Sequence, residues 1–258
     1  GAPRPGYRRS LAQMDAYLYQ LIADRRAALE CSPTALEHSA AAPLPADMLG
    51  LLIASGMEDG LIRDQLLTML IAGHDTVTAL MAWTLYLLGS HPDAYRRAQA
   101  EADAVLARGE LPGYAQLNGL VYLEQVIREA LRLYPPIHLG SRLAAVDLEY
   151  DGYRIPAGER VIYSIYLTQR HPDCWPDPDR FDPERHQPGH SPQPYSWLAF
   201  GGGPRNCIGA AFGQVEARLV LGYVLRNFSL RLHDRRVTPH MGATLEPAPG
   251  VWMDAVRR

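Results

Sequence analysis

The chain has 258 residues, of which 47% are hydrophobic and 21% are charged, and its formal net charge is −3. This composition can bury a sizeable core in one or two domains, and the nearly neutral charge gives no reason to expect nucleic acid as a partner. The three cysteines, Cys31, Cys174 and Cys207, are far apart and form no CxxC pair, which argues against a disulfide framework, a zinc ribbon and a thioredoxin-type site.

The N-terminal third is predicted to be helical, with helices over 10–29, 47–54 and 58–89 and a loop rich in Pro and Ala over 31–46. Residues 66–88 are apolar enough to raise the question of a membrane span. His74 and Asp75 lie in the middle of this stretch, where charge is costly in lipid. We therefore expect a central, buried core helix and no membrane span. Without a signal-peptide pattern, the protein is expected to be soluble and cytoplasmic.

The rest of the chain mixes helices with short strands. Helices are expected over 93–108, 119–133 and 208–227, strands over 142–150, 153–155 and 160–166, irregular coil over 171–197, and short strands over 228–258. The pair Asp151-Gly152 predicts a hairpin turn, and Pro135-Pro136 ends the second of these helices. This order does not fit a βαβ repeat, so the expected fold class is mainly α with minor β.

The strongest chemical signal is the segment from Phe200 to Gly209, which reads Phe-Gly-Gly-Gly-Pro-Arg-Asn-Cys-Ile-Gly. Its glycines let the backbone adopt positive φ angles and approach a flat ligand closely. Cys207 lies just before a predicted helix, whose free N–H groups favour the thiolate form. Arg205, two residues earlier, can pair with a carboxylate of the ligand. These features suit an axial thiolate ligand of a haem iron.

Other interpretations of Cys207 remain open on the residues alone. A phosphatase-type nucleophile needs catalytic Asp or His partners and a phosphate-binding loop after the cysteine, but apolar residues follow it here. A phosphate-binding glycine loop of the P-loop type would contain GK[ST], which is missing. A buried structural cysteine does not account for five constrained positions within ten residues.

The segment resembles the cytochrome P450 signature FxxGxRxCxG at Phe200, Gly203, Arg205, Cys207 and Gly209. Three further motifs of that family occur in this chain, in the same order as in the family. Ala72-Gly73-His74-Asp75-Thr76 is similar to the oxygen-activation motif, Glu129-Ala-Leu-Arg132 to the ExxR motif, and Phe181-Asp-Pro183-Glu-Arg185 to the meander motif. The resemblance covers residues from about 10 to 258. It implies the C-terminal part of the P450 fold, as a single haem-thiolate domain over 1–258 that is truncated on its N-terminal side.

The resemblance implies a haem b cofactor with Cys207 as the metal ligand. The other residues expected to bind the cofactor are Ala72, Gly73, Arg142, Phe200, Gly201, Arg205 and Gly209. Arg142 and Arg205 would reach the propionates, and the alternative for Arg142 is an exposed arginine on a strand. Ile137, His138 and Met241 are expected to line the substrate pocket.

Asp75 and Thr76 are the catalytic residues that the resemblance implies, organising water and relaying protons during dioxygen activation. The Thr76 hydroxyl can compete for the carbonyl of Ala72 and locally open the helix. The alternative is a buried polar cluster satisfied within the helix. His74 occupies a variable position of the motif and is expected to face away from the haem.

Glu129 and Arg132 share one helix face at a spacing of three residues. With Arg185 they are expected to form a buried network that holds the cysteine loop. In isolation, such a pair is usually solvated and contributes little to stability. The resemblance implies that the Glu129–Arg132 pair matters for folding of the haem domain and takes no part in the chemistry.

The implied reaction is insertion of one atom of dioxygen into a small apolar organic substrate. Electrons would come from NAD(P)H through a separate ferredoxin or flavoprotein reductase, because the chain holds no flavin or nucleotide motif. The resemblance begins about midway along the family's sequence, so the N-terminal half is a further expected partner. Two alternatives are a catalytically silent haem-binding remnant and a P450 that uses peroxide directly.

Overall fold

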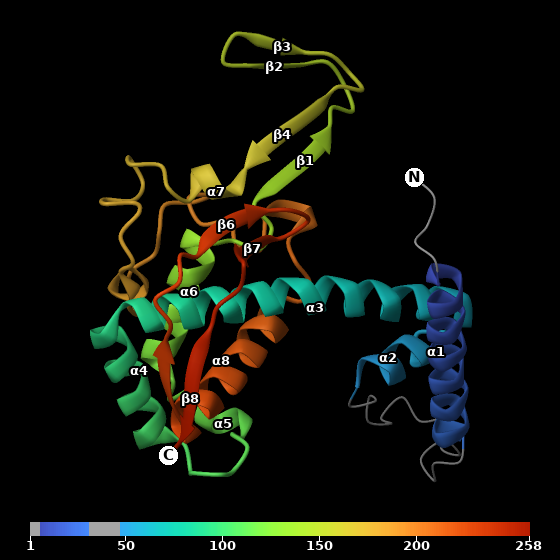
Figure 1. The fold of residues 1–258 in the computed structure, drawn as a ribbon. Coiled ribbons are helices and arrows are strands. Elements are labelled where there is room, and N and C mark those ends of the chain that lie inside the picture. The colour runs from blue at the N-terminus through green and yellow to red at the C-terminus, as the bar shows by residue number, and fades with distance from the viewer. Residues whose placement is uncertain (1–5, 31–46) are drawn as a thin grey trace. The chain divides into compact units, whose positions relative to one another are not determined.

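The computed structural model describes residues 6–30 and 47–258. The predicted loop over 31–46, with Cys31, lies outside the described residues. The chain divides into two compact units, residues 1–72 and 73–258. Figure 1 shows the elements in chain order along its colour bar. Whether the chain acts as the single domain expected from its sequence stays a prediction.

The first unit contains α1 (Tyr7–Glu30), α2 (Met48–Ala54) and the start of α3 (Asp59–Ser90). Ile22 and Ile62 are fully buried in it. Ion pairs of Arg63 with Asp15 and of Arg26 with Asp59 tie α3 to α1. The predicted helices are thus confirmed here with boundaries that differ by one to three residues.

The second unit is built on helices. They are the remainder of α3, α4 (Pro92–Val105), α5 (Tyr114–Leu117), α6 (Val121–Leu133), α7 (Ile165–Thr168) and α8 (Ala210–Asn227). Two short 3-10 helices, η2 (Pro183–His186) and η3 (Gly203–Arg205), interrupt the coil. The hydrophobic core lies between the C-terminal half of α3 and helices α4, α6 and α8. Ten of the 13 residues of α6 are buried, so α6 is the central helix of this unit.

Glycine permits the closest packing in this core. A Cβ atom at Gly222 of α8 would lie 2.9 Å from Leu120 Cδ1, closer than side chains tolerate. The Pro135-Pro136 pair follows α6, which ends at Leu133 as predicted. Helix α8 therefore packs closely against the start of α6, and α6 ends shortly before the two prolines.

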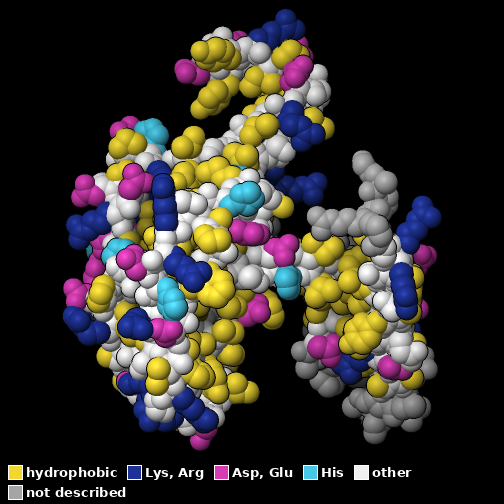
Figure 2. Space-filling view, in the orientation of Figure 1, with side chains coloured by type: hydrophobic (Ala, Val, Ile, Leu, Met, Phe, Trp, Pro, Cys, Tyr) yellow, Lys and Arg dark blue, Asp and Glu magenta, His cyan; other side chains and the backbone are white. Residues whose placement is uncertain are grey.

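Four two-stranded antiparallel sheets lie around the helices among the described residues. They pair β1 (Leu139–Leu143) with β4 (Arg160–Ser164), β2 (Leu148–Tyr150) with β3 (Tyr153–Ile155), β5 (Phe228–Leu232) with β8 (Met253–Arg257), and β6 (Thr238–Met241) with β7 (Leu245–Ala248). The turn at Asp151-Gly152 joins β2 to β3, as predicted, and Tyr150 and Tyr153 are exposed on this hairpin. Figure 2 shows hydrophobic side chains on the surface of the hairpin, at the top of the view. The mainly α fold class with minor β is confirmed.

Two predicted strands were too long. The strand expected over 142–150 is divided, because Asp147 turns its carboxylate to the Ala157 amide and to Arg154 instead of continuing a ladder. The strand expected over 160–166 ends at Ser164, whose hydroxyl accepts a hydrogen bond from the Leu167 amide and caps α7. Local side-chain hydrogen bonds thus override the alternating pattern at both places.

Helix α3 differs from expectation in its burial. Its C-terminal half is buried, with Leu80 and Trp83 in the core. The earlier residues Leu70 and Ile71 are 53% and 61% exposed. Within the described part of the chain, α3 is the one helix long and apolar enough to cross a membrane, and 22% of its most apolar window is buried. The prediction of a helix buried along its whole length is therefore wrong for its first half.

Candidate functional site

The cysteine loop is a compact turn before α8. Gly201 and Gly203 adopt φ angles of +76° and +68°, which an L side chain rarely tolerates. The Cys207 amide donates to the Phe200 carbonyl at 2.8 Å, and the Gly201 amide donates to the Leu198 carbonyl at 2.8 Å. These bonds close the loop and place Cys207 three residues before the first residue of α8. The predicted glycine turns are present.

Cys207 and its apolar neighbours are exposed. Ile208 is 93% exposed and Phe212 is 71% exposed, although both are large and hydrophobic. A Cβ atom at Gly209 would lie 3.8 Å from the Cys207 sulfur, so the glycine leaves the thiol open on that side. An accessible thiol beside two uncovered apolar side chains fits a large, flat, apolar ligand bound through sulfur.

Val77, the residue after the oxygen-activation motif, lies near the start of α8. A Cβ atom at Gly213 of α8 would lie 3.9 Å from Val77 Cγ2, one residue after Thr76. On the same stretch of α3, His74 Nδ1 lies 2.7 Å from an oxygen of Asp75. Helix α3 is continuous from Asp59 to Ser90, and the local opening expected at Thr76 stays a prediction. The orientation of His74 toward a ligand stays a prediction.

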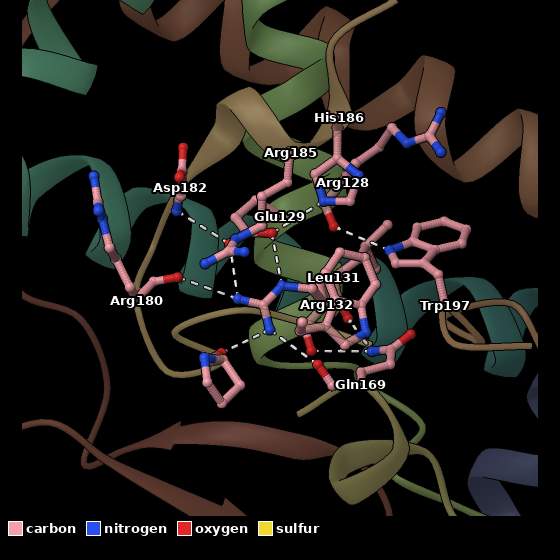
Figure 3. A network of polar contacts seen from close by, with 12 residues as sticks. Arg128, Glu129, Leu131, Arg132, Gln169, Arg180, Asp182, Arg185, His186 and Trp197 are labelled. Carbon is pink, nitrogen blue, oxygen red and sulfur yellow. Dashed lines mark hydrogen bonds and ion pairs between the residues drawn. The ribbon is translucent and has the colours of Figure 1, made fainter. Parts of the chain in front are cut away.

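The ExxR pair is fully buried and bidentate (Figure 3). Arg132 Nε donates to one carboxylate oxygen of Glu129 and Nη2 to the other, both at 2.8 Å. Arg132 also donates to three backbone carbonyls, those of Gln169 (2.9 Å), Pro178 (2.7 Å) and Arg180 (3.2 Å). The structure therefore places this pair where it joins α6 to the coil after α7.

Arg185 joins the network more weakly than expected. Its Nε lies 3.5 Å from Glu129 Oε1, which makes an ion pair but not a hydrogen bond. Its Nη2 donates to the Asp177 carbonyl at 3.0 Å. The three predicted network residues are thus brought together, with Arg132 supplying the hydrogen bonds.

Sequence reasoning missed His186, the residue next to Arg185. Its side chain is fully buried, and its Nε2 lies 3.0 Å from Glu129 Oε2. Burial lowers the pKa of His186 although Glu129 opposes this shift, so the imidazole is neutral at pH 7 and donates through Nε2. Burial raises the pKa of Glu129, but the hydrogen bonds from Arg132 and His186 outweigh burial and hold it below its ordinary value.

The residues predicted for the pocket come from two neighbouring segments. The Leu245 amide donates to the Pro136 carbonyl at 2.8 Å, which joins the β6–β7 hairpin to the chain just before Ile137 and His138. Met241 lies opposite Leu245 in the hairpin. Ile137 and Met241 are 43% and 55% exposed, whereas His138 is buried and its Nδ1 has no partner among the described residues.

The two arginines predicted to bind propionates are both exposed. Arg142 lies on β1 with its guanidinium 5.7 Å from the centre of the Tyr163 ring, and its Nη1 donates to the Ser141 carbonyl. Arg205 ends η3 beside the cysteine loop. Both are accessible to an anionic ligand, and their propionate contacts stay a prediction.

Comparisons with known proteins agree with this arrangement. The family model for cytochrome P450 matches residues 4–252. Cytochrome P450 4V2 of Rattus norvegicus is 37% identical over 202 residues, covering 76% of this chain and 38% of the relative. The putative cytochrome P450 135B1 of Mycobacterium tuberculosis is 37% identical over 254 residues, covering 92% of this chain and 50% of the relative.

A crystal structure of the cytochrome P450DA heme domain superimposes on this chain with a TM-score of 0.86. It is 30% identical in sequence, and the match covers 99% of this chain and 56% of that one. The chain thus spans about half or less of the length of these relatives.

Proposed function

Because the chain belongs to the cytochrome P450 family, we propose that it is the haem-binding C-terminal part of a haem-thiolate monooxygenase. The enzyme would insert one atom of dioxygen into a small apolar organic substrate, with electrons delivered from NAD(P)H by a separate ferredoxin or flavoprotein reductase. The observation that carries the proposal is the exposed Cys207, presented by a glycine turn at the start of α8.

Cys207 would hold the haem iron as a thiolate, and its loop would supply the close approach. When bound, haem supplies the redox chemistry of dioxygen activation, and a thiolate ligand favours cleavage of the O–O bond. Arg142 and Arg205 would pair with the propionates, because both side chains are exposed and accessible to an anionic ligand. Ile208 and Phe212 would be covered by the ligand.

Asp75 and Thr76 of α3 would deliver protons during dioxygen activation, and Ile137 and Met241 would contact the substrate. Asp75 is exposed and carries a neighbouring imidazole, so it can exchange protons with water. Thr76 would position that water near the ligand. Ile137 and Met241 present exposed apolar surface, which suits an apolar substrate.

The decisive test is the ferrous–CO spectrum of the haem-loaded protein. The Cys207→Ser variant should lose the thiolate-type Soret band. Cys174→Ser is the matched control, because Cys174 is a half-buried free cysteine whose sulfur lies 3.6 Å from Gln193. Survival of the band in Cys207→Ser, or its absence from the unmodified protein, would show that Cys207 is not the iron ligand.

A second measurement separates a monooxygenase from a peroxide-using enzyme. Product formation is compared with NADPH plus a reductase and with hydrogen peroxide as the source of oxidant. Asp75→Asn and Thr76→Ala should lower turnover with the reductase far more than turnover with peroxide, because peroxide already carries the protons that they would deliver. Equal losses with both oxidants would contradict the proton-delivery role.

A further inference from the structure

Gln169 lies at the end of α7 and has a fully buried side chain. Its Nε2 donates to the carbonyls of Leu131 (2.9 Å) and Arg132 (3.0 Å). Its Oε1 accepts a hydrogen bond from the Leu198 amide at 2.7 Å. Both amide protons and the amide oxygen are therefore used, in a site that no solvent reaches (Figure 3).

The carbonyls of Leu131 and Arg132, which accept hydrogen bonds from Gln169, belong to the last turn of α6. Helix α6 ends at Leu133, so these carbonyls have no partner within the helix. The Gln169 backbone carbonyl in turn accepts from Arg132 Nη1 at 2.9 Å. Gln169 is thus bonded to the buried Glu129–Arg132 pair through its backbone and to the end of its helix through its side chain.

On its other side, Gln169 is bonded to the segment that carries the thiol. The Leu198 amide donates to Gln169, and the Leu198 carbonyl accepts from the Gly201 amide at 2.8 Å. The Phe200 carbonyl then accepts from the Cys207 amide at 2.8 Å. A short run of hydrogen bonds therefore leads from α6, through one glutamine side chain, to Cys207.

Neighbouring side chains hold the residues just before Leu198. Trp175 Nε1 donates to the Ser196 carbonyl at 3.2 Å, and Trp197 Nε1 donates to the Arg128 carbonyl at 3.3 Å. Both bonds are longer than the 2.7 Å contact of Gln169, which is also the one nearest in sequence to the glycine turn. Leu198 is therefore the bonded position nearest to the turn, and Gln169 is its side-chain partner.

We propose that Gln169 is a positioning residue for Cys207, fixing the loop so that the sulfur keeps its thiolate ligation. This inference rests on the proposed haem-thiolate function. Without the amide, the Leu198 N–H and two helix-end carbonyls would be buried and unsatisfied, and the loop would shift to satisfy them. The shift would displace the Cys207 sulfur in particular, because the loop bonded to Gln169 through Leu198 carries that residue.

The test compares Gln169→Met with Gln99→Met in the haem-loaded full-length protein. Met is close to Gln in shape and offers no amide. Gln99 is the matched control, because its Nε2 donates to the carbonyls of Leu225 and Phe228 at the end of α8, away from the cysteine loop. Three quantities are measured for each variant: haem bound per chain, the fraction of the thiolate-type ferrous–CO band, and the rate of haem transfer to an acceptor protein.

Gln169→Met loses three hydrogen bonds, of which the one from the Leu198 amide bears on the cysteine loop. Loss of that one bond should lower the ratio of thiolate-ligated to displaced haem by about two- to tenfold. Gln99→Met should leave that ratio unchanged even where it lowers the thermal midpoint. Gln169→Glu should restore part of the band, because burial keeps its carboxyl protonated and able both to donate and to accept. An unchanged ratio in Gln169→Met, or an equal loss in Gln99→Met, would overturn the inference.

Failure of the inference is distinct from failure of the proposed function. If the unmodified protein lacks the thiolate band, the haem-thiolate function is wrong. If it shows the band and Gln169→Met keeps it, only the role of Gln169 is wrong. Should Gln169→Met not fold, the comparison of Gln169→Glu with the unmodified protein still decides, because a protonated carboxyl offers one donor where the amide offers two. A thiolate-type band fraction equal to that of the unmodified protein would then overturn the inference.

Discussion

Arg132→Lys is the sharpest perturbation of the buried network, because Arg132 uses all five of its N–H donors. Two meet the Glu129 carboxylate and three meet the backbone carbonyls of Gln169, Pro178 and Arg180. Lysine keeps the positive charge but has three donors on one nitrogen. At least two of the five hydrogen bonds must therefore be lost. The Glu129 oxygens also accept from His186 and from the Asp182 amide, so the loss falls on the backbone carbonyls.

The expected loss follows from this count. Each buried acceptor left without a donor costs about 1–3 kcal/mol, so two cost about 2–6 kcal/mol. Arg132→Met removes the charge as well and leaves the Glu129 carboxylate buried without it, which by itself costs about 3–5 kcal/mol. Since domains are stable by about 5–15 kcal/mol, the lysine variant should fold with reduced stability and the methionine variant should be close to unfolded.

Urea unfolding followed by tryptophan fluorescence measures these changes. The Trp175 ring lies 5.0 Å from the Arg132 guanidinium and reports on the site directly. Arg96→Lys is the control, because Arg96 pairs with Asp93 at the same spacing of three residues but on the surface. The midpoint of Arg96→Lys should not move. If Arg132→Lys is as stable as the unmodified protein, or Arg132→Met is no less stable than Arg132→Lys, the count of buried donors does not govern stability here.

Three further predictions concern pH, packing and the C-terminal strand. Burial lowers the pKa of His186, so below about pH 6.5 the unfolded chain binds the proton first and the free energy of unfolding falls; His186→Phe should flatten this part of the stability curve measured by urea unfolding. Gly222→Ala should lower the thermal midpoint by overpacking, whereas Gly213→Ala on the same helix should not, since its added methyl group meets ordinary contacts. Arg258 and Arg226 donate to the Asp103 carboxylate and keep its pKa below the ordinary value, and Arg258 directly follows β8. Asp103→Asn removes this ion pair at the end of β8, so amide hydrogen exchange in β8 should become faster.

Periodicity and punctuation were enough to predict most of the helices. The helix expected over 119–133 has apolar residues on several faces and is followed closely by two prolines; α6 ends at Leu133 as expected and begins at Val121, two residues later than expected. The glycine turn was predictable for a different reason. Positive φ angles favour glycine, so the glycines themselves indicated the turn conformation found at Gly201 and Gly203.

The long-range members of the network were not predictable in this way. His186 and Gln169 lie in or beside irregular coil, 57 and 37 residues from their α6 partners. No periodicity links such positions, and a histidine or glutamine in a polar segment usually faces solvent. The signal that existed was the buried arginine itself. Five donors in a dry site require five acceptors; Glu129 supplies two, and the backbone carbonyls of the segment from Gln169 to Arg180 supply the other three.

The candidate site has a buried part behind the cysteine loop and an exposed part around Cys207, and the two parts differ in how far this chain completes them. The buried network behind the cysteine loop is formed within this chain, since Glu129, Arg132 and Gln169 are fully buried with their side chains hydrogen-bonded. The surface that would face the ligand is open, with Ile208 and Phe212 mostly exposed. Covering two such side chains contributes up to about 1.5–3 kcal/mol each, or about 3–6 kcal/mol together. In the proposed holoprotein, haem binding is therefore driven partly by covering these residues, while the position of the sulfur is already set by the folded chain.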